Sequence, residues 1–171
     1  MSQAYFEVEG GHSLHGEVIP QGAKNEALQI LCAVLLTAEP VQISNIPDIL
    51  DVNRLMELLR GLGVRVEKLG AGKYEFEARE IDLEYMSTPE YRSDAKKIRG
   101  SVMLLGPLLA RYGKAYLPKP GGDKIGRRRL DTHFLGFEKL GASFEYDEIR
   151  KAYYLRADAL KGKYMLLDEI S

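Results

Sequence analysis

Apolar and polar positions change between helical and strand-like spacing along the chain, and these changes mark successive elements. Residues Lys24–Thr37 predict a helix whose second half is apolar on nearly every side, typical of a helix that other elements enclose. A short strand follows at Val41–Ser44. The next helix, which runs to about Leu59, has a single apolar face, and Asp48 or Asp51 is expected to cap it. A hairpin, whose two strands are separated by a turn with two glycines, ends this first cycle of elements.

A second cycle repeats this order. Residues Asp94–Arg111 predict another enclosed helix, kinked at Pro107, and Lys114–Leu117 predict a strand. A helix at Leu130–Leu140 and a hairpin complete the cycle. The segment Leu62–Val66 is also matched by Leu140–Phe144, 78 residues later, with the same Leu-Gly start. The chain therefore reads as an internal repeat, against the alternative of two unrelated helix-hairpin pairs.

A repeated unit that hides one helix completely indicates several units whose helices pack together inside, with their sheets outside. The expected class is α+β. Before the repeats, Tyr5–Glu9 and Ser13–Ile19 show some alternation and predict two further strands.

Composition narrows the classes of function. The chain has 171 residues, a formal net charge of −1 and one cysteine, so a general attraction to nucleic acid or membrane is not expected. The first residues have neither the basic nor the apolar region of a secretory signal, so none is expected. The apolar stretch Ala27–Leu36 is too short to span a bilayer. These features favour a cytoplasmic protein.

The residues Pro118–Arg129 after the strand of the second cycle combine glycine and proline with lysine and arginine, and Asp123 is the one acid among them. Backbone N–H groups and guanidinium groups of such a loop suit phosphate oxygens. A solvated charged loop remains an equal alternative from the residues alone. A nucleic-acid patch is less favoured because no aromatic residues stand between the charges.

Two further cationic positions open the two enclosed helices. Lys24, with Asn25, lies where helix N–H groups and the helix dipole favour an anion. Arg99, near Lys96 and Lys97, occupies the analogous place in the second cycle, so the two starts are expected to converge. The alternatives are an exposed lysine at a frayed end and an arginine that reaches out to solvent.

Other reactive side chains carry weaker signals. His12, His15 and His133 show no metal-binding spacing, and no order of a catalytic triad is readable. Cys32 stands mid-helix among apolar neighbours and is expected in the core.

Together these segments resemble the enolpyruvyl transferases, and within them the UDP-N-acetylglucosamine enolpyruvyl transferase family. The resemblance covers nearly the whole chain and is carried by four motifs in order. They are Gly22–Leu28, Ile98–Ser101 with Leu105–Arg111, Pro120–Gly126, and Arg128–His133.

This resemblance implies an inside-out α/β barrel and transfer of the enolpyruvyl group of phosphoenolpyruvate to the 3-hydroxyl of UDP-N-acetylglucosamine, the first committed step of peptidoglycan synthesis. It implies no metal or organic cofactor and no nucleic-acid or membrane partner. By match, Asp123 is the catalytic acid, and Lys24, Asn25 and Arg128 bind phosphoenolpyruvate. The residues expected to bind UDP-N-acetylglucosamine are Asn25, Arg99, Arg128, Arg129, Leu130, Asp131, Thr132, Ile170 and Ser171.

The chain departs from the family at two positions and in length. The family usually has cysteine where Asp123 stands, the site of fosfomycin alkylation, and lysine where Glu169 stands. Family members are more than twice as long, so the expected organisation is strands of the second domain at residues 1–21 and a truncated first domain at 22–171. This domain would hold two repeats and the start of a third. We expect such a fragment to be inactive without the C-terminal half and prone to self-association.

Two alternatives stay open at this stage. One is an enzyme like enolpyruvylshikimate-phosphate synthase, although the serine-containing lysine motif of that sister family is not found. The other is a non-catalytic module that binds anions or nucleic acid.

Overall fold

The computed structural model describes residues 4–121 and 130–167, and its strands form two separate sheets. The strands are β1 (Val41–Ile43), β2 (Arg65–Gly70), β3 (Lys73–Glu77), β4 (Lys114–Pro118), β5 (Ser143–Asp147) and β6 (Ala152–Arg156). The α-helices are α1 (Lys24–Ala33), α2 (Leu50–Gly61), α3 (Pro89–Ala95), α4 (Leu105–Tyr112) and α5 (Asp131–Lys139). Three 3₁₀ helices are η1 (Val34–Leu36), η2 (Glu84–Ser87) and η3 (Arg99–Leu104).

The two sheets have the same topology. Their strand orders are β1-β3-β2 and β4-β6-β5, and every neighbouring pair is antiparallel. In each sheet the first strand pairs with the last strand of a hairpin that follows an amphipathic helix. The predicted strands and hairpins of both cycles are confirmed.

The hydrogen bonds at the helix ends repeat as well. Leu59 accepts from the N–H of Val64 at 3.0 Å, and Phe137 accepts from the N–H of Ala142 at 2.9 Å, 78 positions later in both partners. Between them, Gly63 has φ 94° and Gly141 has φ 105°, a region in which a Cβ is strained. The predicted internal repeat is therefore confirmed in the backbone.

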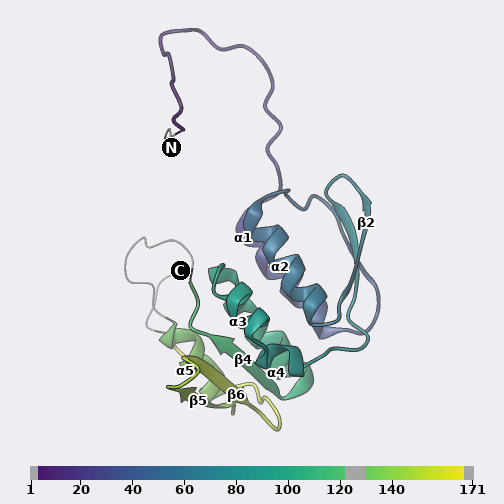
Figure 1. Ribbon diagram of the computed structural model, residues 1–171, viewed down its shortest axis with the longest axis vertical. Helices are drawn as coiled ribbons and strands as arrows, with labels where there is room; N and C mark the ends of the chain where they lie inside the picture. The colour runs from purple at the N-terminus through teal and green to yellow at the C-terminus, as the bar shows by residue number, and fades with distance from the viewer. Residues whose placement is uncertain (1–3, 122–129, 168–171) are drawn as a thin grey trace.

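Helices α1 to α4 lie between the two sheets, with β2 and its neighbours on one side and β4, β5 and β6 on the other (Figure 1). The core contains fully buried leucines from both repeats: Leu31, Leu35, Leu55, Leu58, Leu104 and Leu108. Enclosure of the first helix on every side is nevertheless wrong. Ile30 is 46% and Leu36 53% exposed, because no described element covers that face.

The second enclosed helix was expected to be one continuous helix, but it is divided into separate elements. The helix α3 ends at Ala95, and the buried residue Ile98 has extended dihedral angles (φ −131°, ψ 137°) before η3 begins. The buried Oγ of Ser101 lies 2.9 Å from the carbonyl oxygens of both Ala95 and Ile98, so it bonds across this break. A kink was predicted at Pro107, and the change from η3 to α4 falls just before it, between Leu104 and Leu105. This proline lies in the first turn of α4, where a backbone N–H is not needed.

The predicted caps of α2 are wrong too. Ile49 precedes the helix, and no side chain caps it. Asp48 instead accepts a 2.8 Å hydrogen bond from the side chain of Asn53, and Asp51 pairs with Lys24. Both carboxylates therefore bond to side chains, and neither caps the α2 backbone.

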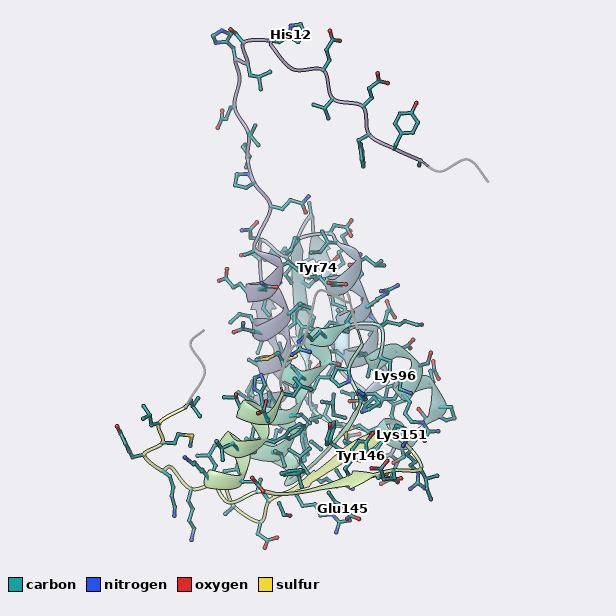
Figure 2. All side chains as sticks on the ribbon, turned by 90° about the vertical axis from the view of Figure 1, so that its left-hand side faces the viewer. His12, Tyr74, Lys96, Glu145, Tyr146 and Lys151 are labelled. Atoms are coloured by element: carbon teal, nitrogen blue, oxygen red, sulfur yellow. The ribbon has the colours of Figure 1, made fainter. Side chains whose placement is uncertain are left out.

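The predicted strands Tyr5–Glu9 and Ser13–Ile19 do not form. Residues 4–22 contain no helix or strand and run away from the body of the molecule, as Figure 1 shows and as the position of His12 in Figure 2 shows. A strand requires a neighbouring strand for its backbone hydrogen bonds, and no described strand pairs with this segment. Elsewhere among the described residues, no helix is long and apolar enough to cross a membrane.

Candidate anion-binding cleft

A cleft of about 620 Å³ lies where the starts of α1, α2 and η3 meet the first turn of α5. Its walls carry both charged and apolar side chains. The charged and polar lining residues are Lys24, Asn25, Gln29, Asp51, Arg54, Lys97, Arg99 and His133, and the apolar ones include Leu28, Leu50, Val102 and Met103.

The first motif forms the start of α1. A Cβ on Gly22 would lie 1.9 Å from the carbonyl oxygen of Asn45, so only glycine fits where the chain passes this loop. The cap residue Ala23 has an extended backbone and no side-chain cap. Lys24 and Asn25 therefore project from an uncapped helix start into the cleft.

Arg99 opens η3 and lines the same cleft. The next residue, Gly100, is so close to α1 that a Cβ there would lie 3.1 Å from a methyl group of Leu28. The start of η3 therefore packs closely against α1, with no room for a side chain at Gly100. The expected convergence of the two cationic starts is thus found in the described residues, although Arg99 opens a 3₁₀ helix rather than an α-helix.

The start of α2 contributes two residues that the sequence reasoning did not assign to a site. Asp51 and Arg54 both line the cleft, and Asp51 Oδ2 lies 3.1 Å from Lys24 Nζ. Their spacing of three places them next to each other on one side of α2. That spacing was the available signal, whereas Asp51 was expected only as a possible helix cap.

The helix α5 brings the last motif to the cleft. Leu130 is half-buried just before the helix, Asp131 and Thr132 form its first turn, and His133 lines the cleft. From the sequence alone, His133 was only weak evidence for a functional site. Its place one residue after the predicted nucleotide-binding run was the signal that could have identified it.

The glycine-rich loop starts beside the cleft. A Cβ on Gly121 would lie 1.9 Å from the carbonyl oxygen of Lys96, next to the lining residue Lys97. Lys97 itself pairs with Asp94 at 2.6 Å. The remaining predicted site residues, Asp123, Arg128, Arg129, Ile170 and Ser171, lie outside the described residues, as does Glu169.

The described lining of the cleft is strongly cationic. It carries Lys24, Arg54, Lys97 and Arg99, and Asp51 is the one acid among the described lining residues. Converging cations beside an uncapped helix start favour a ligand with several negative charges. Within the described ranges no group of three or more histidine, cysteine, aspartate or glutamate side chains is placed to hold a metal ion.

Cys32 lies apart from this chemistry. It is 1% exposed in the core, and burial raises the pKa of its thiol. The prediction that Cys32 is a core residue is confirmed.

Comparison with known proteins identifies proteins of similar sequence. At 60% identity over 98% of the chain, it is similar to a UDP-N-acetylglucosamine 1-carboxyvinyltransferase of Bacteroides thetaiotaomicron. A protein of the same description from Porphyromonas gingivalis is 52% identical over the same share of the chain. The chain spans 39% of the length of each of these relatives.

Solved structures support the fold. The enolpyruvyl transferase NikO from Streptomyces tendae has a TM-score of 0.63 at 24% identity and covers 89% of the chain, which covers 32% of NikO. An EPSP synthase from Acinetobacter baumannii has a TM-score of 0.61 at 15% identity, with 91% of this chain and 35% of that chain covered. At these identities the likeness concerns the fold alone. A sequence profile, however, matches residues 8–168. By that match the chain belongs to the EPSP synthase (3-phosphoshikimate 1-carboxyvinyltransferase) family.

Proposed function

We propose that this chain supplies the cationic substrate-binding part of an enzyme that transfers enolpyruvyl from phosphoenolpyruvate to the 3-hydroxyl of UDP-N-acetylglucosamine. The observation that carries the proposal is that Lys24, Asn25 and Arg99, from two different repeats, line one cleft. Two polyanionic substrates need such a concentration of positive charge. The similar proteins described as UDP-N-acetylglucosamine 1-carboxyvinyltransferases support the choice of acceptor.

The proposed roles follow the two substrates. Lys24, Asn25 and Arg128 bind the carboxylate and phosphate of phosphoenolpyruvate. Asn25, Arg99, Arg128 and Arg129 meet the nucleotide sugar, together with Leu130, Asp131, Thr132, Ile170 and Ser171. The half-buried Leu130 and the first turn of α5, with His133 in the cleft wall, support binding of the nucleotide at this end.

The proposed reaction is addition followed by elimination. A proton goes to the methylene carbon of phosphoenolpyruvate, and the sugar 3-hydroxyl oxygen bonds to the neighbouring carbon while it loses its own proton. Loss of a proton from the new methyl group then restores the double bond as the C–O bond to phosphate breaks. The products are the enolpyruvyl ether and inorganic phosphate, so no redox step or cofactor is required.

Asp123 is the proposed proton donor. A carboxylic acid donates a proton near neutral pH only if its pKa is raised, as removal of water around the carboxyl group would do. A carboxylate at this position lacks the thiolate that fosfomycin alkylates in relatives with cysteine. We therefore expect the family-length enzyme to be insensitive to fosfomycin, and Asp123→Cys to confer sensitivity; irreversible labelling of Asp123 itself would contradict this.

The proposal extends to the setting of the reaction. This transfer is the first committed step of peptidoglycan synthesis, and its substrates are cytoplasmic metabolites. We assign substrate binding to the present chain and catalytic turnover to a protein of the full length of its relatives. In such a protein, residues 1–21 belong to the second domain. No phosphate release is expected from the 171-residue chain with both substrates.

Calorimetric titration of the chain with UDP-N-acetylglucosamine and with shikimate 3-phosphate tests the assignment. We expect binding of the nucleotide sugar to be stronger than binding of shikimate 3-phosphate. In a parallel titration with phosphoenolpyruvate, Lys24→Met should weaken binding, while Lys163→Met, at an exposed site outside the cleft, leaves it unchanged. Preference for shikimate 3-phosphate would indicate the shikimate enzyme instead. Salt-sensitive RNA binding without affinity for either ligand would indicate a nucleic-acid module.

A further inference from the structure

The acid in the cleft lies directly against its first cation. Asp51 Oδ2 is 3.1 Å from Lys24 Nζ, and both side chains remain partly open to solvent, at 36% and 48% exposure. One of the three ammonium N–H groups of Lys24 is thereby used, and Asp51 brings a negative charge into a cleft that otherwise gathers positive charge.

The helix dipoles explain why these two charges pair. Lys24 lies at the N-terminus of α1, where a positive charge is disfavoured, and Asp51 lies in the first turn of α2, where a negative charge is favoured. The carboxylate therefore compensates for the lysine. A half-exposed ion pair contributes only about 0–1 kcal/mol, so a better anion can replace the carboxylate.

We propose that Asp51 is an internal counter-ion of Lys24 that the anionic group of the substrate must displace, and that it thereby acts as a specificity-determining residue. A phosphate group displaces Asp51 because Lys24, Arg54 and Arg99 line the same cleft and attract it together. A monovalent ion such as chloride gains too little from them to compete. This inference rests on the proposed function, since it assumes that Lys24 binds a substrate anion.

The test compares two neutralising variants of matched charge. Asp51→Asn removes the counter-ion, and Asp48→Asn removes a carboxylate just before α2 that does not line the cleft and bonds to Asn53. Inorganic phosphate is titrated into each full chain at low ionic strength, followed by amide chemical shifts. Asp51→Asn is expected to bind phosphate about threefold more tightly than wild type and to be inhibited by chloride, while Asp48→Asn behaves like wild type.

Other outcomes decide against the proposal. Unchanged or weaker phosphate binding by Asp51→Asn would mean that Asp51 merely holds Lys24 in place, and absence of phosphate binding by every variant would also overturn the proposal. Asp51→Glu, which keeps the charge, should retain the wild-type affinity and serves if the asparagine variant fails to fold. If UDP-N-acetylglucosamine binds but Asp51→Asn changes nothing, this inference fails alone; if neither ligand binds, the proposed function fails with it.

Discussion

Arg111 Nη1 lies 2.8 Å from the carbonyl oxygen of Ala78, so the last turn of α4 in the second repeat bonds directly to the end of the first hairpin. The same nitrogen lies 3.0 Å from the carbonyl oxygen of Leu35 and 2.8 Å from that of Thr37. Its two hydrogens are shared among these three backbone acceptors. One guanidinium group therefore joins two segments of the first repeat, Leu35–Thr37 and the end of the hairpin, to the second repeat.

Replacing Arg111 by methionine should lower the free energy of unfolding by about 2–4 kcal/mol, because it leaves partly buried carbonyl groups without a donor. Urea unfolding followed by circular dichroism measures this change. Arg60→Met is the matched control, since Arg60 forms only a surface pair with Glu57 and should cost at most about 0.5 kcal/mol. Equal stabilities of the two variants would show that Arg111 does not join the repeats.

The glycines at the helix ends and within helices should respond in opposite directions. Gly63 has φ 94°, and a Cβ there would lie 2.8 Å from the carbonyl oxygen of Glu80, so Gly63→Ala should destabilise the protein by about 1–3 kcal/mol. Gly136 lies inside α5, and a methyl group added there would meet nothing within 4 Å, so Gly136→Ala should stabilise the protein by about 0.5–1 kcal/mol. Thermal unfolding of both variants checks the pair of signs. A stabilising Gly63→Ala would argue against the repeated turn.

The start of the glycine-rich loop offers a third prediction. A methyl group on Gly121 would meet the carbonyl oxygen of Lys96 at 1.9 Å, so Gly121→Ala must move either the loop or the segment before Arg99. We expect it to weaken binding of UDP-N-acetylglucosamine by about tenfold, since small displacements of positioning groups are costly. Gly162→Ala, whose site is open, serves as the control in the same calorimetric titration. Equal affinities of the two variants would separate the loop from the cleft.

The sequence predicted the elements of the repeat because their signals are local. The positive-φ turn at Gly63 and its copy at Gly141 require glycine whatever surrounds them, and the flanking hydrophobic spacing repeats with them. Thr88 illustrates a local signal that was overlooked. Its Oγ1 accepts a 3.1 Å bond from the N–H of Tyr91, and Pro89 follows it, a usual start of a helix.

Structural features that depend on residues far apart in the sequence could not be predicted from local sequence signals. Aspartate is a residue type that commonly caps helices, but Asp51 pairs with Lys24, which is 27 positions away in the sequence. Ser101 forms hydrogen bonds across the break before η3, and the spacing of hydrophobic residues does not indicate such bonds. The motifs indicated that Lys24 and Arg99 belong to one site, whereas Arg54 joined it only through the packing of α2.

The buried thiol predicts how stability depends on pH. Burial raises the pKa of Cys32 in the folded protein, while in the unfolded chain the thiol ionises at about pH 8.5. Below that pH the thiol is protonated in both states, and its full contribution to stability is present. As pH rises above it, only the unfolded state loses the proton, so the free energy of unfolding should fall by about 1.4 kcal/mol by about pH 9.5.

Urea unfolding at about pH 7 and about pH 9.5 measures this loss in the wild type and in Cys32→Ala. The alanine variant should be less stable at both values, because it leaves a small cavity, but its loss between them should be smaller by about the same 1.4 kcal/mol. Tyr91 does not confuse the comparison: burial raises its pKa too, and its unfolded form ionises only at about pH 10. Rapid reaction of the folded protein with a thiol reagent at about pH 8, or equal pH dependence in both proteins, would show that Cys32 is accessible and would contradict its place in the core.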